Sequence, residues 1–175
     1  KNSVAFHQAD ETDWKITMVD TGANTMTGGR LKLLKEFMGD QTFMVTYGDG
    51  LANVNVNELL KFHKKHGKLI TVTSVHPGSR YGELFIERDK VISFKEKPQL
   101  NEGWVNGGFF VVEPEFFELI DDEDTVLEQE PLEKAVKMGE MMAFRHNGFW
   151  HSMDTKRDYE NLDRIWKDGS PPWIL

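Results

Sequence analysis

The sequence predicts an α/β fold in which a mixed, mostly parallel sheet is covered by helices. Apolar stretches of strand length alternate with stretches of helical periodicity, as in sheets whose strands are joined by crossover helices. The run Phe43–Tyr47 is apolar almost throughout, which is typical of a strand buried on both faces. The 175 residues suit a single domain, so we expect one domain over residues 1–175.

The N-terminal third is expected to hold three strands and one helix. Thr27 is a plausible N-cap for the helix, whose apolar positions recur at helical spacing. Gly39 and Asp40 should end it. The opening strand has no helix before it, which is unusual in a fold that covers its sheet. In chain order the predicted elements are strands Val4–His7 and Lys15–Val19, a helix from about Gly29 to Met38, and strand Phe43–Tyr47.

The remaining elements follow the same alternation. Gly67 should stop the helix before it, because glycine readily takes the left-handed conformation at a helix end. The charged triplet Arg88–Lys90 should turn a hairpin. The predicted elements are helix Val56–His66, strand Leu69–Val75, hairpin strands Glu83–Glu87 and Val91–Phe94, strand Val105–Val112, short helices beginning at Pro114 and near Pro131, strand Met141–Arg145 and helix Lys156–Lys167.

Composition narrows the function classes. A formal net charge of −8 disfavours sequence-independent binding of nucleic acid, which needs a basic surface. The absence of cysteine excludes disulfides and cysteine-based zinc sites, and it fits a cytoplasmic protein. No apolar run approaches the length of a membrane span, so we expect no membrane partner. A phosphorylated substrate stays possible, because Mg²⁺ and a few cations can hold it.

Two aspartates are candidate Mg²⁺ ligands. Asp49 lies between two glycines directly after strand Phe43–Tyr47, and ligands of α/β sheets bind outside the carboxyl ends of strands. Asp154 immediately precedes the last helix. The alternative for Asp49 is a tight turn, and the alternative for Asp154 is an N-cap. One Mg²⁺ usually needs only one or two carboxylates beside phosphate oxygens.

Three further segments could contact a phosphorylated sugar or an anion. In Lys95-Glu96-Lys97-Pro98, Lys97 could neutralise a phosphate and Glu96 could accept hydrogen bonds from hydroxyls. Asn106 offers both a donor and an acceptor before Gly107 and Gly108. The glycines in Thr27-Gly28-Gly29-Arg30 open a helix whose N-terminus could face an anion. The alternatives are a solvated strand end, a β-bulge and an ordinary helix start, respectively.

Taken together in order, these motifs resemble the sugar-1-phosphate nucleotidyltransferase family, in particular its glucose-1-phosphate cytidylyltransferase branch. The resemblance covers most of the chain, and its specificity comes from the order of the set rather than from any one motif. The motifs are Val-Asp-Thr-Gly, Met-Thr-Gly-Gly-Arg-Leu, Thr-Tyr-Gly-Asp-Gly, Pro-Gly-Ser-Arg-Tyr-Gly, Phe-Lys-Glu-Lys-Pro, Asn-Gly-Gly-Phe-Phe, Glu-Gln-Glu-Pro-Leu and Gly-Phe-Trp-x-x-Met-Asp-Thr.

The resemblance implies a Rossmann-like nucleotide-diphospho-sugar transferase fold and an enzyme that uses CTP, α-D-glucose 1-phosphate and Mg²⁺. It also implies CDP-glucose and pyrophosphate as products, a role in lipopolysaccharide O-antigen biosynthesis, and a homo-oligomer. By this resemblance Asp49 and Asp154 bind the metal, and Lys97 holds the sugar phosphate. The implied hexose contacts are Gly82, Glu96, Asn106 and Glu128, and the implied nucleotide contacts are Thr27, Gly28, Gly29 and Arg30.

The sequence departs from the family in one respect. The family's Gly-rich triphosphate loop and the Lys-Pro after it do not occur here, so we expect an N-terminally truncated chain that is inactive by itself. Two alternatives stay open: a transferase that uses UTP or dTTP, and a catalytically silent sugar-phosphate-binding or assembly module. The apolar C-terminus, Trp173–Leu175, is a candidate for contacts between subunits.

Overall fold

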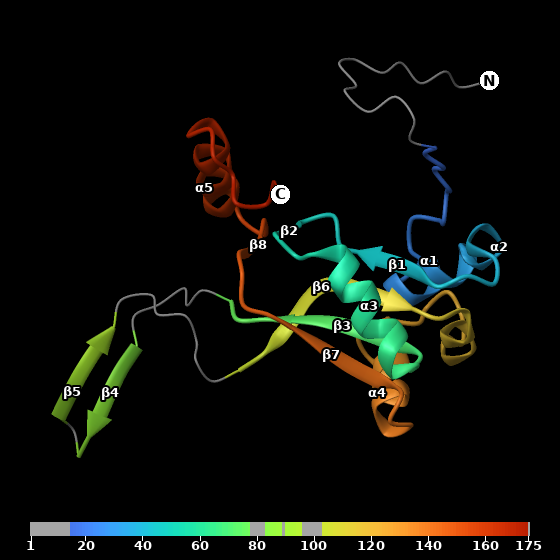
Figure 1. Cartoon of the computed structure of the whole chain (residues 1–175), viewed down its shortest axis with the longest axis horizontal. Helices are drawn as coiled ribbons and strands as arrows, with labels where there is room; N and C mark the ends of the chain where they lie inside the picture. Colours follow the sequence, from blue (N-terminus) through green and yellow to red (C-terminus); the bar gives the residue numbers. More distant parts are fainter. Residues whose placement is uncertain (1–14, 78–82, 89, 96–102, 175) are drawn as a thin grey trace.

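A four-stranded mixed sheet forms the centre of the computed structural model, which describes residues 15–77, 83–88, 90–95 and 103–174. Strand β6 pairs antiparallel with both β1 and β3, whereas β3 and β7 are parallel. Strands β1, β3 and β7 therefore share one direction, and their carboxyl ends lie at one edge of the sheet together with the start of β6 (Figure 1). In spatial order the strands are β1 (Phe43–Thr46), β6 (Val105–Val112), β3 (Ile70–Val75) and β7 (Met141–His146).

Helices pack against both faces of this sheet, which confirms the predicted α/β class. One face carries the larger core, where the rings of Phe43 and Phe117 stack with their centroids 5.2 Å apart. The other face carries α3 (Val56–His66), whose Leu59 packs with Val54 and Val111. The elements on the larger core are α1 (Thr27–Leu33), α2 (Lys35–Met38), the 3₁₀ helix η1 (Pro114–Leu119) and α4 (Glu130–Lys137).

Elements with a strong local signal form as predicted. Helix α3 has the predicted bounds, because Asn55 accepts a hydrogen bond from the Glu58 backbone at its start and left-handed Gly67 ends it. Every residue of β3 is buried, as its β-branched composition suggests. Strands β4 (Glu83–Glu87) and β5 (Lys90–Lys95) form the predicted hairpin.

Four N-terminal predictions need correction or stay open. The segment Lys15–Val19 forms no strand, since no described strand pairs with it and an isolated strand cannot satisfy its backbone groups. The expected helix from Gly29 to Met38 is two short helices that meet at Leu34. Its predicted N-cap is also wrong, because Met26 caps α1 and Thr27 is already helical. The predicted strand Val4–His7 lies outside the described residues.

A small second sheet was not predicted. Strand β2 (Gly50–Ala52) pairs antiparallel with β8 (Trp150–Ser152), so a turn after β1 meets the segment before the last helix, α5 (Lys156–Lys167). Three-residue strands carry too little periodicity to be recognised in a sequence. Thr155 caps α5 in a capping box with Asp158, so the N-cap interpretation of Asp154 is wrong by one residue.

A chain of buried and partly buried polar side chains joins α3 to the sheet. The Nε2 atom of His63 lies 2.9 Å from a carboxylate oxygen of Glu113, which can only accept, so Nε2 carries the proton. The Nδ1 atom of His63 then accepts from the Thr71 hydroxyl at 2.8 Å. The Nδ1 atom of His66 accepts from the Lys68 backbone at 3.0 Å, so His66 donates through Nε2 to the same hydroxyl at 2.7 Å.

This arrangement predicts that stability depends on pH through His66. Burial, reinforced by the neighbouring His63 and Lys68, lowers the pKa of His66 below its ordinary value. The unfolded state therefore binds more protons than the folded state below about pH 6.5, and the stabilising effect, present above that pH, is lost as the pH falls. Urea titrations near pH 5.5 and near pH 7.5 should give a lower midpoint in acid for the wild type. His66→Gln should shrink that difference, and an undiminished difference would contradict this account.

Close packing at the start of α1 yields a second prediction. A Cβ atom at Gly29 would lie 2.3 Å from the Glu123 carbonyl oxygen, so Gly29→Ala must push α1 away from that loop. We expect a loss of about 1–3 kcal/mol in the free energy of unfolding, measured by urea titration. Gly48→Ala is the control, because a Cβ there would meet none of the described atoms within 4 Å. Equal stability of the two variants would show that the loop yields without cost.

Candidate functional site

Polar residues gather at the sheet edge where β1, β3 and β7 end. Tyr47 and Asp49 follow β1, and Asn106 is the second residue of β6. The segment that contains β8 follows β7. Ligands of α/β sheets bind at this kind of edge, outside the carboxyl ends of the strands. The topology therefore brings several of the predicted site residues to one place.

The β2–β8 pairing brings the two candidate metal ligands together. Gly50 is paired with Ser152, and the Met153 backbone N–H donates to the Asp49 carbonyl oxygen at 2.8 Å. Asp49 precedes β2 and Asp154 follows β8, so the two residues lie on neighbouring segments although they are far apart in the sequence. Both side chains are exposed. The Ser152 hydroxyl donates to Asp154 Oδ2 at 2.8 Å, which orients that carboxylate.

A bulge in β6 anchors this small sheet to the large one. The pairing of β6 with β3 shifts register between Val72 and Ser74, which confirms a β-bulge at Gly107 and Gly108. The Trp150 indole N–H donates to the Gly107 carbonyl at 2.8 Å and so ties β8 to the bulge. A Cβ atom at Gly107 would lie 2.8 Å from Val75 Cγ1, so only glycine fits without a shift.

Four side chains from separate segments form one hydrogen-bonded group, which we call the Tyr47 network: Thr27, Tyr47, Asn106 and Glu128. The Tyr47 hydroxyl donates to Glu128 Oε1, and the Asn106 amide donates to the Tyr47 hydroxyl at 3.3 Å. The Thr27 hydroxyl donates to Glu128 Oε2 at 2.8 Å and accepts from the Leu127 backbone at 2.9 Å. Three of the four were predicted site residues, and the structure brings them together.

Tyr47 is the member that sequence reasoning missed. Burial raises the pKa of its hydroxyl well above the ordinary value, and the hydrogen bond to Glu128 and the nearby charge of Asp49 raise it further. The hydroxyl therefore stays protonated and donates to Glu128 at physiological pH. Its signal in the sequence was its place between strand β1 and Asp49, where a tyrosine resembles the apolar residues before it.

The segment Thr27–Arg30 serves the packing of α1 more than its sequence suggested. The N–H groups of Gly28 and Gly29 both donate to the Thr125 carbonyl, at 3.0 and 3.1 Å. The Arg30 guanidinium donates to Thr21 Oγ1 at 2.6 Å and to the Ala23 carbonyl at 3.3 Å. These donors are engaged within the protein, so Thr27 is the residue of the segment that reaches the Tyr47 network.

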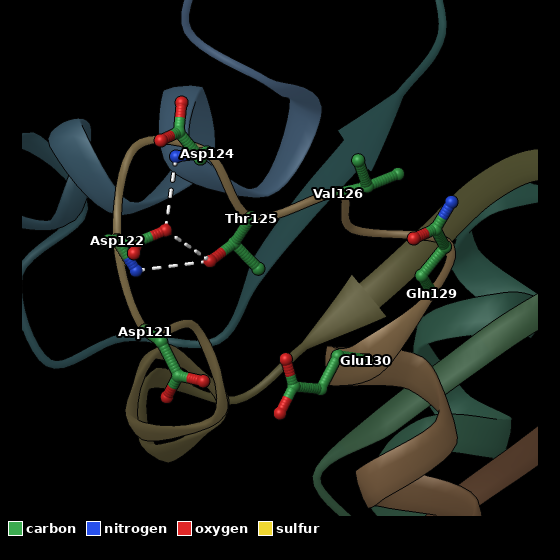
Figure 2. A pocket seen from close by; sticks show the side chains of 7 residues that line it. All are labelled: Asp121, Asp122, Asp124, Thr125, Val126, Gln129 and Glu130. Carbon is green, nitrogen blue, oxygen red and sulfur yellow. Dashed lines mark hydrogen bonds between the residues drawn. The ribbon is translucent and has the colours of Figure 1, made fainter.

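An acidic hollow lies at the start of α4 (Figure 2). In it, Asp122 Oδ1 accepts from the Asp124 backbone at 3.1 Å and from the Thr125 hydroxyl at 3.0 Å, which shapes the turn. Lys134 pairs with both Asp121 and Glu130, each at 3.0 Å. Glu130 is therefore paired with Lys134 of its own helix, α4, whereas Glu128 belongs to the Tyr47 network. The lining residues are Asp121, Asp122, Asp124, Thr125, Val126, Gln129 and Glu130.

Several predicted contacts lie outside the described residues, namely Gly82, Glu96 and Lys97. Within the described part of the chain, no group of three or more His, Cys, Asp or Glu side chains could hold a metal ion. Asp49 and Asp154 are exposed carboxylates on segments that a backbone hydrogen bond joins, and such a donor set suits Mg²⁺, because this ion keeps water and substrate phosphates as its other ligands. In the same described part, no helix has the length and apolarity to cross a bilayer.

Comparison with known proteins identifies the family of this chain. The family model for nucleotidyl transferases matches residues 1–168. Glucose-1-phosphate cytidylyltransferase of Salmonella typhi is 45% identical over 174 residues, which are 99% of this chain and 68% of that protein. Mannose-1-phosphate guanylyltransferase 1 of Arabidopsis thaliana is 31% identical over 163 residues, 89% of this chain and 45% of that protein.

A solved structure supports the fold. HddC from Yersinia pseudotuberculosis superposes with a TM-score of 0.62 at 21% identity, covering 82% of this chain and 64% of that chain. The chain thus spans about two thirds of the length of the Salmonella typhi relative and of HddC. From the matching family model and the extent of the identity, the chain belongs to the nucleotidyl transferase family of enzymes, with glucose-1-phosphate cytidylyltransferases among its relatives.

Proposed function

We propose that the protein transfers a cytidylyl group from CTP to α-D-glucose 1-phosphate, giving CDP-glucose and pyrophosphate. The carrying observation is the β2–β8 pairing, which brings Asp49 and Asp154 to the carboxyl edge of the sheet beside the Tyr47 network. The name of the Salmonella typhi relative supports the choice of nucleotide and sugar. The 68% coverage of that relative makes this a proposal for the whole protein.

Mg²⁺ is the cofactor in this proposal. Asp49 and Asp154 would hold it, and when bound it would neutralise charge on the nucleotide phosphates. Among the described side chains at this edge, Asp49, Asp154 and Glu128 are acidic and exposed. Binding of a triphosphate therefore needs positive charge from the metal and from cations such as Lys97.

The reaction asks the protein mainly to position its substrates. An oxygen of the sugar phosphate attacks the α-phosphorus of CTP in line, a new P–O bond forms, and the bond to the pyrophosphate leaving group breaks. Lys97 holds the sugar phosphate by direct counter-charge. Glu96, Asn106, Glu128 and the backbone at Gly82 contact the hexose. No covalent intermediate with a side chain is needed.

The segment Thr27–Arg30 borders the nucleotide in this proposal. Its contribution is shape, since Gly28 and Gly29 let α1 approach the loop at Thr125 and Arg30 holds the chain at Thr21.

The Arabidopsis relative is named for a different nucleotide and sugar, so a panel of CTP, UTP, dTTP and GTP is the direct test of base choice. A whole protein that binds glucose 1-phosphate but transfers no nucleotidyl group would favour the silent binding module instead.

A cytoplasmic location and a homo-oligomer are also part of the proposal. In the predicted contact segment Trp173–Leu175, Trp173 packs on Phe149 with ring centroids 5.5 Å apart, and Ile174 is exposed.

Removing either metal-binding carboxylate should impair catalysis. In the whole protein, Asp49→Asn and Asp154→Asn should each lower kcat by about 10²–10³-fold, because each change removes charge stabilisation of the transition state. Pyrophosphate release at saturating Mg²⁺ measures the effect. Asp40→Asn is the matched control, since Asp40 is exposed in the turn before β1. If both site variants retain wild-type turnover, neither aspartate is a metal ligand for the reaction.

Removing the charge of Lys97 should weaken sugar binding. Lys97→Ala should raise the Kd for glucose 1-phosphate by about tenfold or more, since a hydrogen bond to a charged group contributes about 1.5–3 kcal/mol. Calorimetry on the whole protein measures this Kd directly. Lys64→Ala, an exposed position on α3, is the control for loss of one positive charge. An unchanged Kd in the Lys97 variant would remove this residue from the phosphate site.

A further inference from the structure

The hydroxyl of Tyr47 connects two side chains that the proposed function assigns to the hexose. It donates to Glu128 Oε1 and accepts from Asn106 Nδ2 at 3.3 Å, and these partners come from different parts of the chain. We propose that Tyr47 is a positioning residue that sets the selectivity for the hexose hydroxyls by holding Glu128 and Asn106 in a common geometry. This inference rests on the proposed function and adds to it how the sugar is read.

The hydrogen-bonding capacity left over in the network suits a sugar hydroxyl. Asn106 Oδ1 accepts from the Gly108 backbone at 2.8 Å and one amide hydrogen goes to Tyr47, so the second amide hydrogen can reach a ligand. Each oxygen of Glu128 takes one donor, from Tyr47 and from Thr27, and each can accept another. A hydroxyl both donates and accepts, so it can bridge these two side chains.

Tyr47 is rigidly placed by the two strands that it joins. Its backbone N–H donates to the Gly108 carbonyl at 3.1 Å, and its ring meets the Phe110 ring edge-on with centroids 5.7 Å apart. Gly108 has a φ of +79°, and a Cβ there would lie 2.8 Å from Tyr47 Cδ2, so this glycine opens the space for the ring. The hydroxyl is therefore fixed by backbone that belongs to the sheet.

Glu128 is the partner that needs this support. Its side chain is exposed and sits on the loop before α4, where a free glutamate would sample several rotamers. Donors from Thr27 and Tyr47 hold one carboxylate oxygen each, so the plane of the carboxylate is defined. Without the Tyr47 hydroxyl, a single donor remains and Glu128 can rotate away from the sugar. Sites built on fixed polar partners reject ligands that lack the matching hydroxyl much better than loose sites do.

The test is Tyr47→Phe in the whole protein, assayed with glucose 1-phosphate and with its 2-, 3-, 4- and 6-deoxy analogues. We expect KM for glucose 1-phosphate to rise about tenfold or more, while KM for CTP stays close to that of the wild type. With the analogue that lacks the hydroxyl read by Glu128, the loss should be much smaller, so the selectivity ratio shrinks. Tyr159→Phe, at an exposed position of α5, is the matched control and should keep wild-type values.

A double-mutant cycle separates positioning from a general structural effect. In a Glu128→Ala background, Tyr47→Phe should cost little more, because the side chain through which it acts is already gone. Additive losses, or equal losses for every sugar and for CTP, would overturn the inference. So would a Tyr47→Phe variant with unchanged KM and selectivity. A wild type that transfers no nucleotide to any sugar phosphate would instead overturn the proposed function, and the two failures are thus distinguishable.

Discussion

The insertion of β6 between β1 and β3 is the constraint on which the rest of the structure depends. Because β6 runs against both neighbours, its first residues lie beside the last residues of β1 and β3. Asn106 thereby reaches Tyr47, and the bulge at Gly107 and Gly108 turns a carbonyl toward Trp150. A fully parallel arrangement would place the start of this strand at the opposite edge, far from the residues that follow β1.

The bulge converts backbone geometry into a polar site. Gly107 packs against Val75 where a side chain would not fit, and Gly108 adopts a positive φ that makes room for the Tyr47 ring. Two extra residues of β6 opposite Thr73 also interrupt the ladder, and the Thr73 hydroxyl is buried without a hydrogen-bond partner among the described residues. The cost of such an irregularity is local, whereas the gain is an edge where side chains from four segments converge.

The two faces of the sheet differ in the interactions that hold their helices in place. On the side of α1 and α4 the contacts are apolar and aromatic, with Phe110, Phe116 and Phe117 almost fully buried. On the side of α3 a polar chain runs from His66 through Thr71 and His63 to Glu113. Each donor in this chain has an acceptor, which limits the cost of burying it and fixes the seat of α3 on the sheet.

The sequence by itself determined the elements whose signals are local. Hydrophobic period, β-branched composition and a glycine stop sufficed for α3, β3 and β6, and the Asn-Gly-Gly triplet already allowed a bulge. Local signals also limited the accuracy at helix starts. Asp154 and Thr155 are both residues that favour the N-cap. Thr27 was also predicted as an N-cap, although its hydroxyl donates to Glu128.

Only the tertiary structure decided which candidate residues meet. No local pattern says that Asp49 lies beside Met153, since the β2–β8 pairing depends on where β1 and β7 end in space. Nor could the sequence show that the donors of Gly28, Gly29 and Arg30 are engaged within the protein, or that Tyr47 joins Glu128 to Asn106. Periodicity reports which face of an element is buried, whereas long-range hydrogen bonds depend on the register between elements that the sheet order brings together.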